Sequence, residues 1–167
     1  MCYYFLPEDF KKLNREVEHI ICRIKQIGRD MGASCEEGAE TYHDNFAYEE
    51  GERQQAMWSR RLREFMKVME NAQIVSPEKK SEKVALGSKI TICDENTQEE
   101  KTFVIGSYMT FDDPGSISYN SPLGSQLIGA SEGDVCECSI AGKKRLYEIV
   151  AISYVVLYRI NGNSSSG

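Results

Sequence analysis

Apolar residues in the first part of the chain recur at alternating spacings of three and four. The series runs Phe10, Leu13, Val17, Ile20, Ile24, Ile27 and Met31. This heptad pattern predicts a helix from about Pro7 to Met31, ending near Gly32, with one narrow apolar stripe. Pro7 suits a first helical turn, and Glu8 and Asp9 complement the positive end of the helix dipole.

A second apolar stripe follows and becomes more polar when it is traced back to Tyr48. Its members are Trp58, Leu62, Phe65, Met69 and Ala72. Each stripe needs a partner surface, and the short connection between the two makes antiparallel pairing the simplest arrangement. Residues 1–75 are therefore predicted to form a helical hairpin whose arm extends roughly 35–40 Å. The alternative is an ordinary α+β core in which both helices fold over the rest of the chain.

The second half of the chain has the pattern of a small sheet. Residues 76–83, around Pro77, are polar and aperiodic, which indicates a linker. Short alternating runs then predict strands, separated by turn residues at 94–98, 112–115 and 141–144. The runs are 89–93, 101–105, 116–119, 134–139 and 146–152. Ser121, Pro122 and Gly129 fit the cap, first turn and end of one short helix. We expect an α+β protein with an antiparallel sheet domain over 84–160 and a disordered tail over 161–167.

Composition narrows the classes of function. The net charge of −6 argues against strong autonomous nucleic-acid binding, because counterion release needs clustered Lys and Arg. No apolar run reaches the roughly 18 residues that span a bilayer, and the N-terminus lacks the basic region of a signal peptide. We therefore expect a cytoplasmic protein with no membrane partner. The predicted sheet domain has no His, no Gly-rich phosphate loop and no obvious carboxylate pair, which favours a binding module over an enzyme.

Six cysteines do not have the spacing of a disulfide scaffold and do not complete a tetrahedral metal set. They are Cys2, Cys22, Cys35, Cys93, Cys136 and Cys138. The last two lie two residues apart in a predicted strand, so both should point to one face. We interpret all six as structural thiols.

Charge is unevenly distributed along the predicted arm. Between Arg29 and Arg53 there is no Lys or Arg, while acidic residues gather toward the tip: Asp30, Glu36, Glu37, Glu40, Asp44, Glu49, Glu50 and Glu52. Basic residues collect on the shaft. An acidic tip repels phosphate unless a divalent cation lies between them. Solvated acidic loops are common, so the charge pattern alone leaves a structural explanation open.

Several motifs resemble the Gre family of transcript cleavage factors, GreA and GreB. The stretch ISYNSPLGSQLIGASEGD at 117–134 is similar to the family's S-x-x-S-P-(L/I)-x-x-x-L-(I/L)-G…GD segment, and a Y-E-I-x-x-I strand follows at 147–152. VALGSKITI at 84–92 resembles the strand that opens its C-terminal domain, and MENAQIV at 69–75 the end of its second coiled-coil helix. The resemblance implies an FKBP-like C-terminal domain that docks beside the secondary channel of RNA polymerase. The arm would then pass down that channel to the active site.

The tip carries a partial match to the family pattern D-x-x-E-N-A-x-Y. Residues 41–48 read T-Y-H-D-N-F-A-Y, so Asp44 falls on the Glu and Thr41 where the Asp would be. The resemblance implies that tip carboxylates help hold a second Mg²⁺ and its water in the polymerase active site, which promotes hydrolysis of backtracked RNA. Asp44 is thus the candidate catalytic and metal-binding residue, with Glu40 as a candidate second carboxylate. The alternative is a capping box that starts at Thr41, and His43 is expected at the surface.

The resemblance also points to Asn120, Ser121 and Pro122 as residues that bind a coiled coil of the polymerase large subunit. A helix start accounts for Ser121 and Pro122 equally well. The implied function is that of a monomeric elongation factor with no cofactor of its own, acting on the polymerase and only indirectly on the RNA 3′ end.

Other functions stay open from the sequence. Thr41 favours a channel binder that modulates or inhibits transcription without promoting cleavage. A prolyl isomerase or chaperone built on the FKBP-like domain, and a plain coiled-coil adaptor, are the remaining alternatives.

Overall fold

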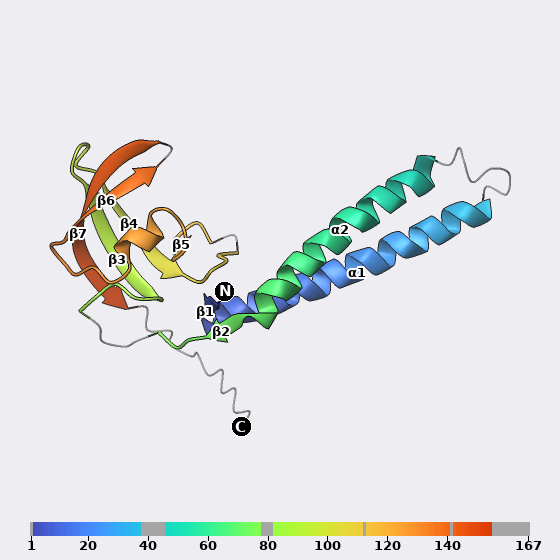
Figure 1. The fold of residues 1–167 in the computed structure, drawn as a ribbon, viewed down its shortest axis with the longest axis horizontal. Helices are drawn as coiled ribbons and strands as arrows, with labels where there is room; N and C mark the ends of the chain where they lie inside the picture. The colour runs from blue at the N-terminus through green and yellow to red at the C-terminus, as the bar shows by residue number, and fades with distance from the viewer. Residues whose placement is uncertain (1, 38–45, 78–81, 112, 141, 155–167) are drawn as a thin grey trace, which may run out of the picture. The chain divides into compact units, whose positions relative to one another are not determined.

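The computed structural model describes residues 2–37, 46–77, 82–111, 113–140 and 142–154. The chain divides into two compact units, residues 1–75 and 76–167, and each is described by itself. The predicted α+β class is confirmed, because the first unit is a helical hairpin and the second is a curled, mostly antiparallel sheet (Figure 1). No helix among the described residues is long and apolar enough to cross a membrane.

The first unit is built on two long helices, α1 (Pro7–Glu37) and α2 (Phe46–Glu70), which lie side by side (Figure 1). The apolar stripe predicted for α1 faces the partner helix: Leu13 and Ile20 are fully buried, and Val17 and Ile27 nearly so. With 31 residues, α1 is roughly 46 Å long at about 1.5 Å per residue. The predicted end near Gly32 is wrong, because one glycine costs a helix only about 1 kcal/mol and need not stop it.

The end of α2 also differs from the prediction. Ala72 was assigned to the apolar stripe, yet α2 ends at Glu70, and Val68 is buried beside Phe65 instead. The side-chain amide of Asn71 donates to the Lys67 carbonyl at 2.8 Å, which satisfies a terminal carbonyl of the helix.

Two contacts fix the antiparallel register of the arm. The Arg61 guanidinium reaches Glu16 of α1 at 3.6 Å and lies over the Phe65 ring, 5.4 Å from its centroid. Toward the tip, Gly51 lies against Met31, and a Cβ at Gly51 would overlap the Met31 Cγ. Contacting residues therefore have decreasing residue numbers on α1 as the residue numbers on α2 increase, as expected for an antiparallel pair.

Two short segments from opposite ends of the first unit form a small parallel sheet that no sequence pattern predicts. Strand β1 (Tyr3–Phe5) pairs with β2 (Ala72–Ile74), and Phe5 is fully buried with its ring 5.9 Å from that of Phe10. Three-residue strands are too short to show alternation, and the pairing joins opposite ends of the unit.

The second unit contains a five-stranded sheet in the order β5-β4-β3-β7-β6. The strands are β3 (Ser88–Asp94), β4 (Glu100–Gly106), β5 (Ser116–Ser118), β6 (Val135–Ile140) and β7 (Lys143–Tyr154). The predicted antiparallel sheet is confirmed for three pairings, whereas the short strand β5 runs parallel to β4. The long connection from 107 to 115 lets the chain return before it pairs again.

The hairpin between β6 and β7 is tighter than the alternating pattern indicated. Ile140 pairs with Lys143, so only two residues form the connection, and Gly142 has a φ of 76° that suits such a turn. Lys143 and Lys144, predicted in the turn, therefore lie in β7.

The core of this unit lies on one face of the sheet, under the short helix α3 (Gly124–Leu127). Ile90, Ile105, Leu127 and Ile149 are fully buried, together with the thiol of Cys138. Cys136 is half-buried and packs against the same core, so the predicted shared face of the two cysteines is confirmed. Burial raises the pKa of both thiols. Five cysteines among the described residues are free thiols.

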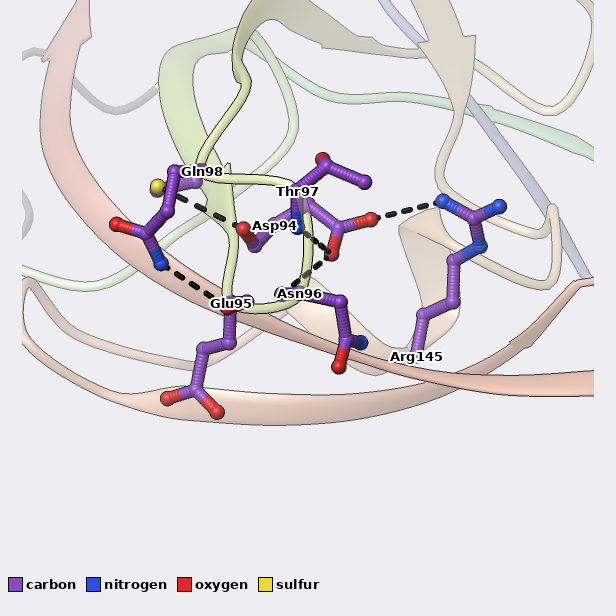
Figure 2. Close-up of polar contacts among 7 residues, drawn as sticks. Asp94, Glu95, Asn96, Thr97, Gln98 and Arg145 are labelled. Carbon is purple, nitrogen blue, oxygen red and sulfur yellow. Dashed lines mark hydrogen bonds and ion pairs between the residues drawn. The ribbon is translucent and has the colours of Figure 1, made fainter.

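One carboxylate lies inside the second unit, at the end of β3. Asp94 is only 2% exposed. One of its oxygens accepts the N–H groups of Asn96 at 2.9 Å and Thr97 at 3.4 Å, and the other accepts from Arg145 of β7 at 2.9 Å (Figure 2). The bond from the Asn96 N–H, aided by Arg145 and Thr97, holds the pKa of Asp94 below its ordinary value, although burial opposes this shift. The carboxylate therefore shapes the β3–β4 turn and ties it to β7.

Replacing Asp94 by Asn is expected to destabilise the second unit at neutral pH and to flatten its response to acid. Because the folded-state pKa is lowered, the ionised carboxylate stabilises the fold above its unfolded-state pKa of about 4, and this contribution is lost as pH falls through the folded value. The two proteins should converge at acid pH, once the carboxyl group of Asp94 is protonated in the folded state as well. Hydrogen exchange of β3 and β7 peptides between pH 7 and pH 3 measures this.

Glu137→Gln is the matched control, because Glu137 makes an exposed pair with Lys144 on the same sheet and should change little. Equal exchange in Asp94→Asn and Glu137→Gln at pH 7 would refute the role given to Asp94.

The close approach at Gly51 predicts opposite effects for similar substitutions on the arm. Gly28→Ala meets no atom within 4 Å and should stabilise the helix by up to about 1 kcal/mol. Gly51→Ala should be less stable than Gly28→Ala by about 1–3 kcal/mol, because its methyl group overlaps Met31. Urea unfolding followed by the fluorescence of Trp58 reports on the arm alone, since the chain has one Trp. Equal free energies of unfolding for Gly28→Ala and Gly51→Ala would show that the Met31 side chain moves aside without cost.

Candidate functional site

The tip residues singled out by the sequence lie outside the described residues. These are Asp44, Glu40, Thr41 and His43. Their roles stay predictions. The chain places them in the connection 38–45, which joins the end of α1 to the start of α2. In the part of the chain that the structure describes, no three His, Cys, Asp or Glu side chains gather into a group that could hold a metal ion.

The described part of the tip is acidic and carries one exposed aromatic ring. Glu49 lies in the first turn of α2, where it complements the helix dipole. Glu50 makes an exposed pair with Arg53 at 3.5 Å. Phe46, the first residue of α2, is 74% exposed. This ring was not identified from the sequence, because a single aromatic residue gives no sign of its exposure.

An open groove of about 590 Å³ runs along the shaft of the arm. It is lined by Arg23 of α1 and by Glu50, Arg53, Gln54, Met57 and Trp58 of α2. A second groove of about 400 Å³ shares Met57 and continues past Arg60, Arg61, Glu64 and Phe65. Guanidinium and aromatic groups together suit the backbone and bases of a nucleic-acid strand. The structure thus shows which basic residues share a face of the arm with Trp58 and Phe65.

The candidate docking segment connects β5 to α3. Asn120 and Pro122 are exposed, whereas Ser121 is half-buried and its hydroxyl accepts the Gly124 N–H at 3.0 Å. Ser121 therefore makes a cap-type bond, although the helix begins at Gly124 and not at Pro122 as predicted. Gly129, the predicted stop, has a φ of 83°. Asn120 and Pro122 are thus the more exposed members of the trio.

Ser118 organises this segment and was not singled out from the sequence. Its hydroxyl donates to the Tyr108 carbonyl at 2.9 Å and accepts the Asn120 N–H at 3.2 Å. Its carbonyl accepts the Ser121 N–H at 3.0 Å, and a Cβ at Gly124 would overlap the same oxygen. The first Ser of the S-x-x-S-P motif was the available signal. The segment is thus bound to the 107–111 loop and closely packed against α3.

The surface around the docking segment has an unusual charge distribution. The sequence has no Lys or Arg from Thr102 to Gly142. The neighbouring loop contributes half-buried Tyr108, Met109 and Phe111. Every ionisable Asp, Glu, Lys or Arg in this stretch is acidic, so any ion pair with a partner would need a basic residue on the partner.

Both units match models of known families. Residues 3–74 match the family described as "Transcription elongation factor, N-terminal", and residues 78–154 match "Transcription elongation factor, GreA/GreB, C-term". The chain belongs to the GreA/GreB family of transcription elongation factors. The resemblance found in the sequence motifs is thereby confirmed.

Similar curated proteins carry the family name over most of their length. Transcription elongation factor GreA of Nautilia profundicola is 30% identical over 148 residues, which are 87% of this chain and 90% of that protein. GreA of Ruegeria pomeroyi is 32% identical over 152 residues, with coverage of 89% and 95%.

Solved structures of the GreA/GreB family are also similar to this chain. GreA factor homolog 1 of Thermus thermophilus has 23% identity and a TM-score of 0.42, and the match covers 91% of this chain and 99% of that one. The GreA/GreB factor of Nitrosomonas europaea has 18% identity and a TM-score of 0.39, with coverage of 92% and 99%.

Removing the Ser118 hydroxyl should loosen the docking segment. Ser118→Ala loses two hydrogen bonds, which predicts a loss of about 1–3 kcal/mol and faster exchange of the Asn120 amide. Ser125→Ala is the control, since the exposed Ser125 hydroxyl makes only a long 3.4 Å bond to the Pro122 carbonyl. Thermal unfolding and amide exchange of both variants test this. Equal unfolding temperatures and equal amide exchange rates in Ser118→Ala and Ser125→Ala would contradict the organising role of Ser118.

Proposed function

We propose that this protein binds RNA polymerase at its secondary channel and stimulates the cleavage of backtracked RNA, which rescues arrested complexes. One observation carries the proposal: a member of the GreA/GreB family holds candidate carboxylates in the connection at the end of a long two-helix arm. Its C-terminal unit presents a separate, organised segment to a partner. Anchoring and chemistry are thus assigned to different parts of one chain.

At the tip, Asp44, with Glu40 as a second carboxylate, supplies oxygen ligands to Mg²⁺ in the polymerase active site. Carboxylate oxygens are the ligands that Mg²⁺ prefers, and a second metal ion in such a site supports the attacking water and the leaving oxygen. The polymerase holds the RNA and the first metal ion. The factor therefore needs no cofactor of its own and does not catalyse cleavage alone.

In the C-terminal unit, Asn120 and Pro122 contact a coiled coil of the polymerase large subunit, and Ser121 holds them in place. Their exposure and the hydrogen bonds from Ser118 support this role. A single copy of the chain is sufficient, since one arm enters one channel.

The groove of Arg23, Arg53 and Trp58 provides a path for the displaced RNA along the arm. The net charge of −6 disfavours capture of free nucleic acid, so the polymerase presents the RNA to the factor.

Thr41 supports a second candidate function, a channel binder that modulates or inhibits transcription without promoting cleavage. One carboxylate in place of two is a poorer ligand set for Mg²⁺. On this alternative the factor competes with a cleavage-promoting relative for the polymerase and gives no cleavage itself.

Asp44→Asn is expected to reduce cleavage in stalled complexes by roughly 10- to 100-fold while polymerase binding is retained, by analogy with the loss of groups that tune a metal site. Thr41→Asp should raise cleavage, because it adds a carboxylate at the position where the family pattern has one. Gel analysis of RNA 3′-end cleavage, together with binding measured by competition, gives both quantities.

Glu49→Gln serves as the charge-matched control, because it also removes one negative charge from the described tip and should leave cleavage nearly unchanged. Unchanged cleavage in Asp44→Asn would contradict the metal-binding role. Binding without any cleavage by the unmodified protein would select the alternative function.

A further inference from the structure

The N-terminal strand β1 binds the chain at the point where it leaves the arm (Figure 1). Its partner β2 follows the end of α2 after Asn71 alone, and β1 precedes the start of α1 with only Leu6 between them. The pair therefore lies at the base of the arm, where α1 begins and α2 ends. We call residues 3–5 the strap.

Backbone hydrogen bonds from the strap enclose the whole segment that follows α2. The Tyr3 N–H donates to the Asn71 carbonyl at 2.9 Å, and the Val75 N–H donates to the Phe5 carbonyl at 2.9 Å. Side-chain packing of this segment is slight, since Gln73 is exposed and Ile74 is 53% exposed. Residues 71–75 are thus held chiefly by their backbone bonds to the strap.

The strap is itself anchored to the arm by one aromatic ring. Phe5 is fully buried, and its ring meets that of Phe10 edge-on with centroids 5.9 Å apart. Phe10 lies at the start of α1, where its N–H donates to the Leu6 carbonyl at 3.0 Å. A two-stranded sheet is only marginally stable alone, so burial of the Phe5 ring is what secures it. The strap therefore makes β2 a continuation of the arm.

The strap determines the residue at which the ordered arm ends. With the strap in place the arm ends at Val75, and without it the arm would end at Glu70. Five residues of extended chain add up to about 16–18 Å of slack to the connection with the second unit. Catalytic groups must be placed far more accurately than this, since a misplacement of about 1 Å can reduce a rate 100-fold.

We propose that the strap positions the tip of the arm for RNA cleavage while the second unit is docked on the polymerase. This inference rests on the proposed function, in which one chain engages the polymerase through both of its units. Tyr3 acts through its backbone N–H and Phe5 through its buried ring. Both are positioning residues and take no part in the chemistry.

Two substitutions at Tyr3 separate the backbone bond from the side chain. Tyr3→Pro removes the N–H that binds the Asn71 carbonyl, whereas Tyr3→Ala removes the same side chain and keeps that N–H. At saturating factor, Tyr3→Pro should lower the maximal rate of cleavage in stalled complexes by roughly 10- to 100-fold. Tyr3→Ala should remain close to the unmodified protein. Phe5→Ala should resemble Tyr3→Pro, and Phe5→Leu should restore most of the rate.

A five-residue Gly/Ser insertion between Val75 and Ser76 separates positioning from stability of the arm. It lengthens the connection by as many residues as loss of the strap and leaves β1 untouched. The inserted protein should show the same loss of maximal rate, with urea unfolding of the arm, followed by Trp58 fluorescence, unchanged. If the strap only covered the base of the helix pair, the insertion would leave the rate intact, and the inference would be overturned.

Small-angle X-ray scattering of the free full-length chain gives a readout that needs no polymerase. Tyr3→Pro and the insertion should both broaden the distribution of interatomic distances relative to Tyr3→Ala. Identical distributions would overturn the inference, whatever the cleavage activity. Broadened distributions in a protein whose unmodified form binds polymerase without cleaving RNA would leave the strap in its mechanical role and refute the proposed function.

Discussion

The arm depends on one interaction: each of its two helices has a narrow apolar stripe, and the two stripes are buried against each other. Leu13 and Ile20 are fully buried in this way, while the outer faces keep their charged residues. The pairing lets the unit grow in length without a globular core, because each added turn brings its own share of buried surface. A helix pair is also stiffer than either helix alone, so its end is held at a defined distance from its base.

The second unit solves a different problem, that of presenting an irregular segment in one conformation. The inner face of the sheet buries the core, and the docking segment lies outside the regular elements. Ser118 and Ser121 satisfy backbone groups on both sides of Asn120, and Gly124 permits the close approach. A segment ordered before binding loses less conformational entropy on association, so more of the contact energy remains as affinity. Asp94 orders the turn after β3 in a similar way, because its carboxylate accepts the backbone N–H groups of Asn96 and Thr97.

Periodic features were predictable from the sequence, and isolated contacts were not. The α1 stripe and most strands are predictable because many residues repeat one spacing. The predicted helix end near Gly32 is wrong because it depends on a single residue, and α1 continues to Glu37. The β1–β2 pair is not predictable, since its strands are short and distant in the sequence. The parallel direction of β5 relative to β4 is not predictable either, because it depends on the path of the connection between them. The family motifs located Asn120 to Pro122, but Ser118 emerged only from its hydrogen bonds, and the tip carboxylates stay predictions.

The distribution of charge along the arm explains why different groups are needed at different places. On the shaft, Arg23 and Arg53 line a groove with Trp58, where a phosphate backbone can be attracted. Between Arg29 and Arg53 the sequence has no Lys or Arg, so the candidate carboxylates of Glu40 and Asp44 have no cation close to them along the chain. Carboxylates also repel the phosphate groups of RNA, which the proposed function brings to the tip. On the proposed mechanism, a metal ion between carboxylate and phosphate removes the repulsion.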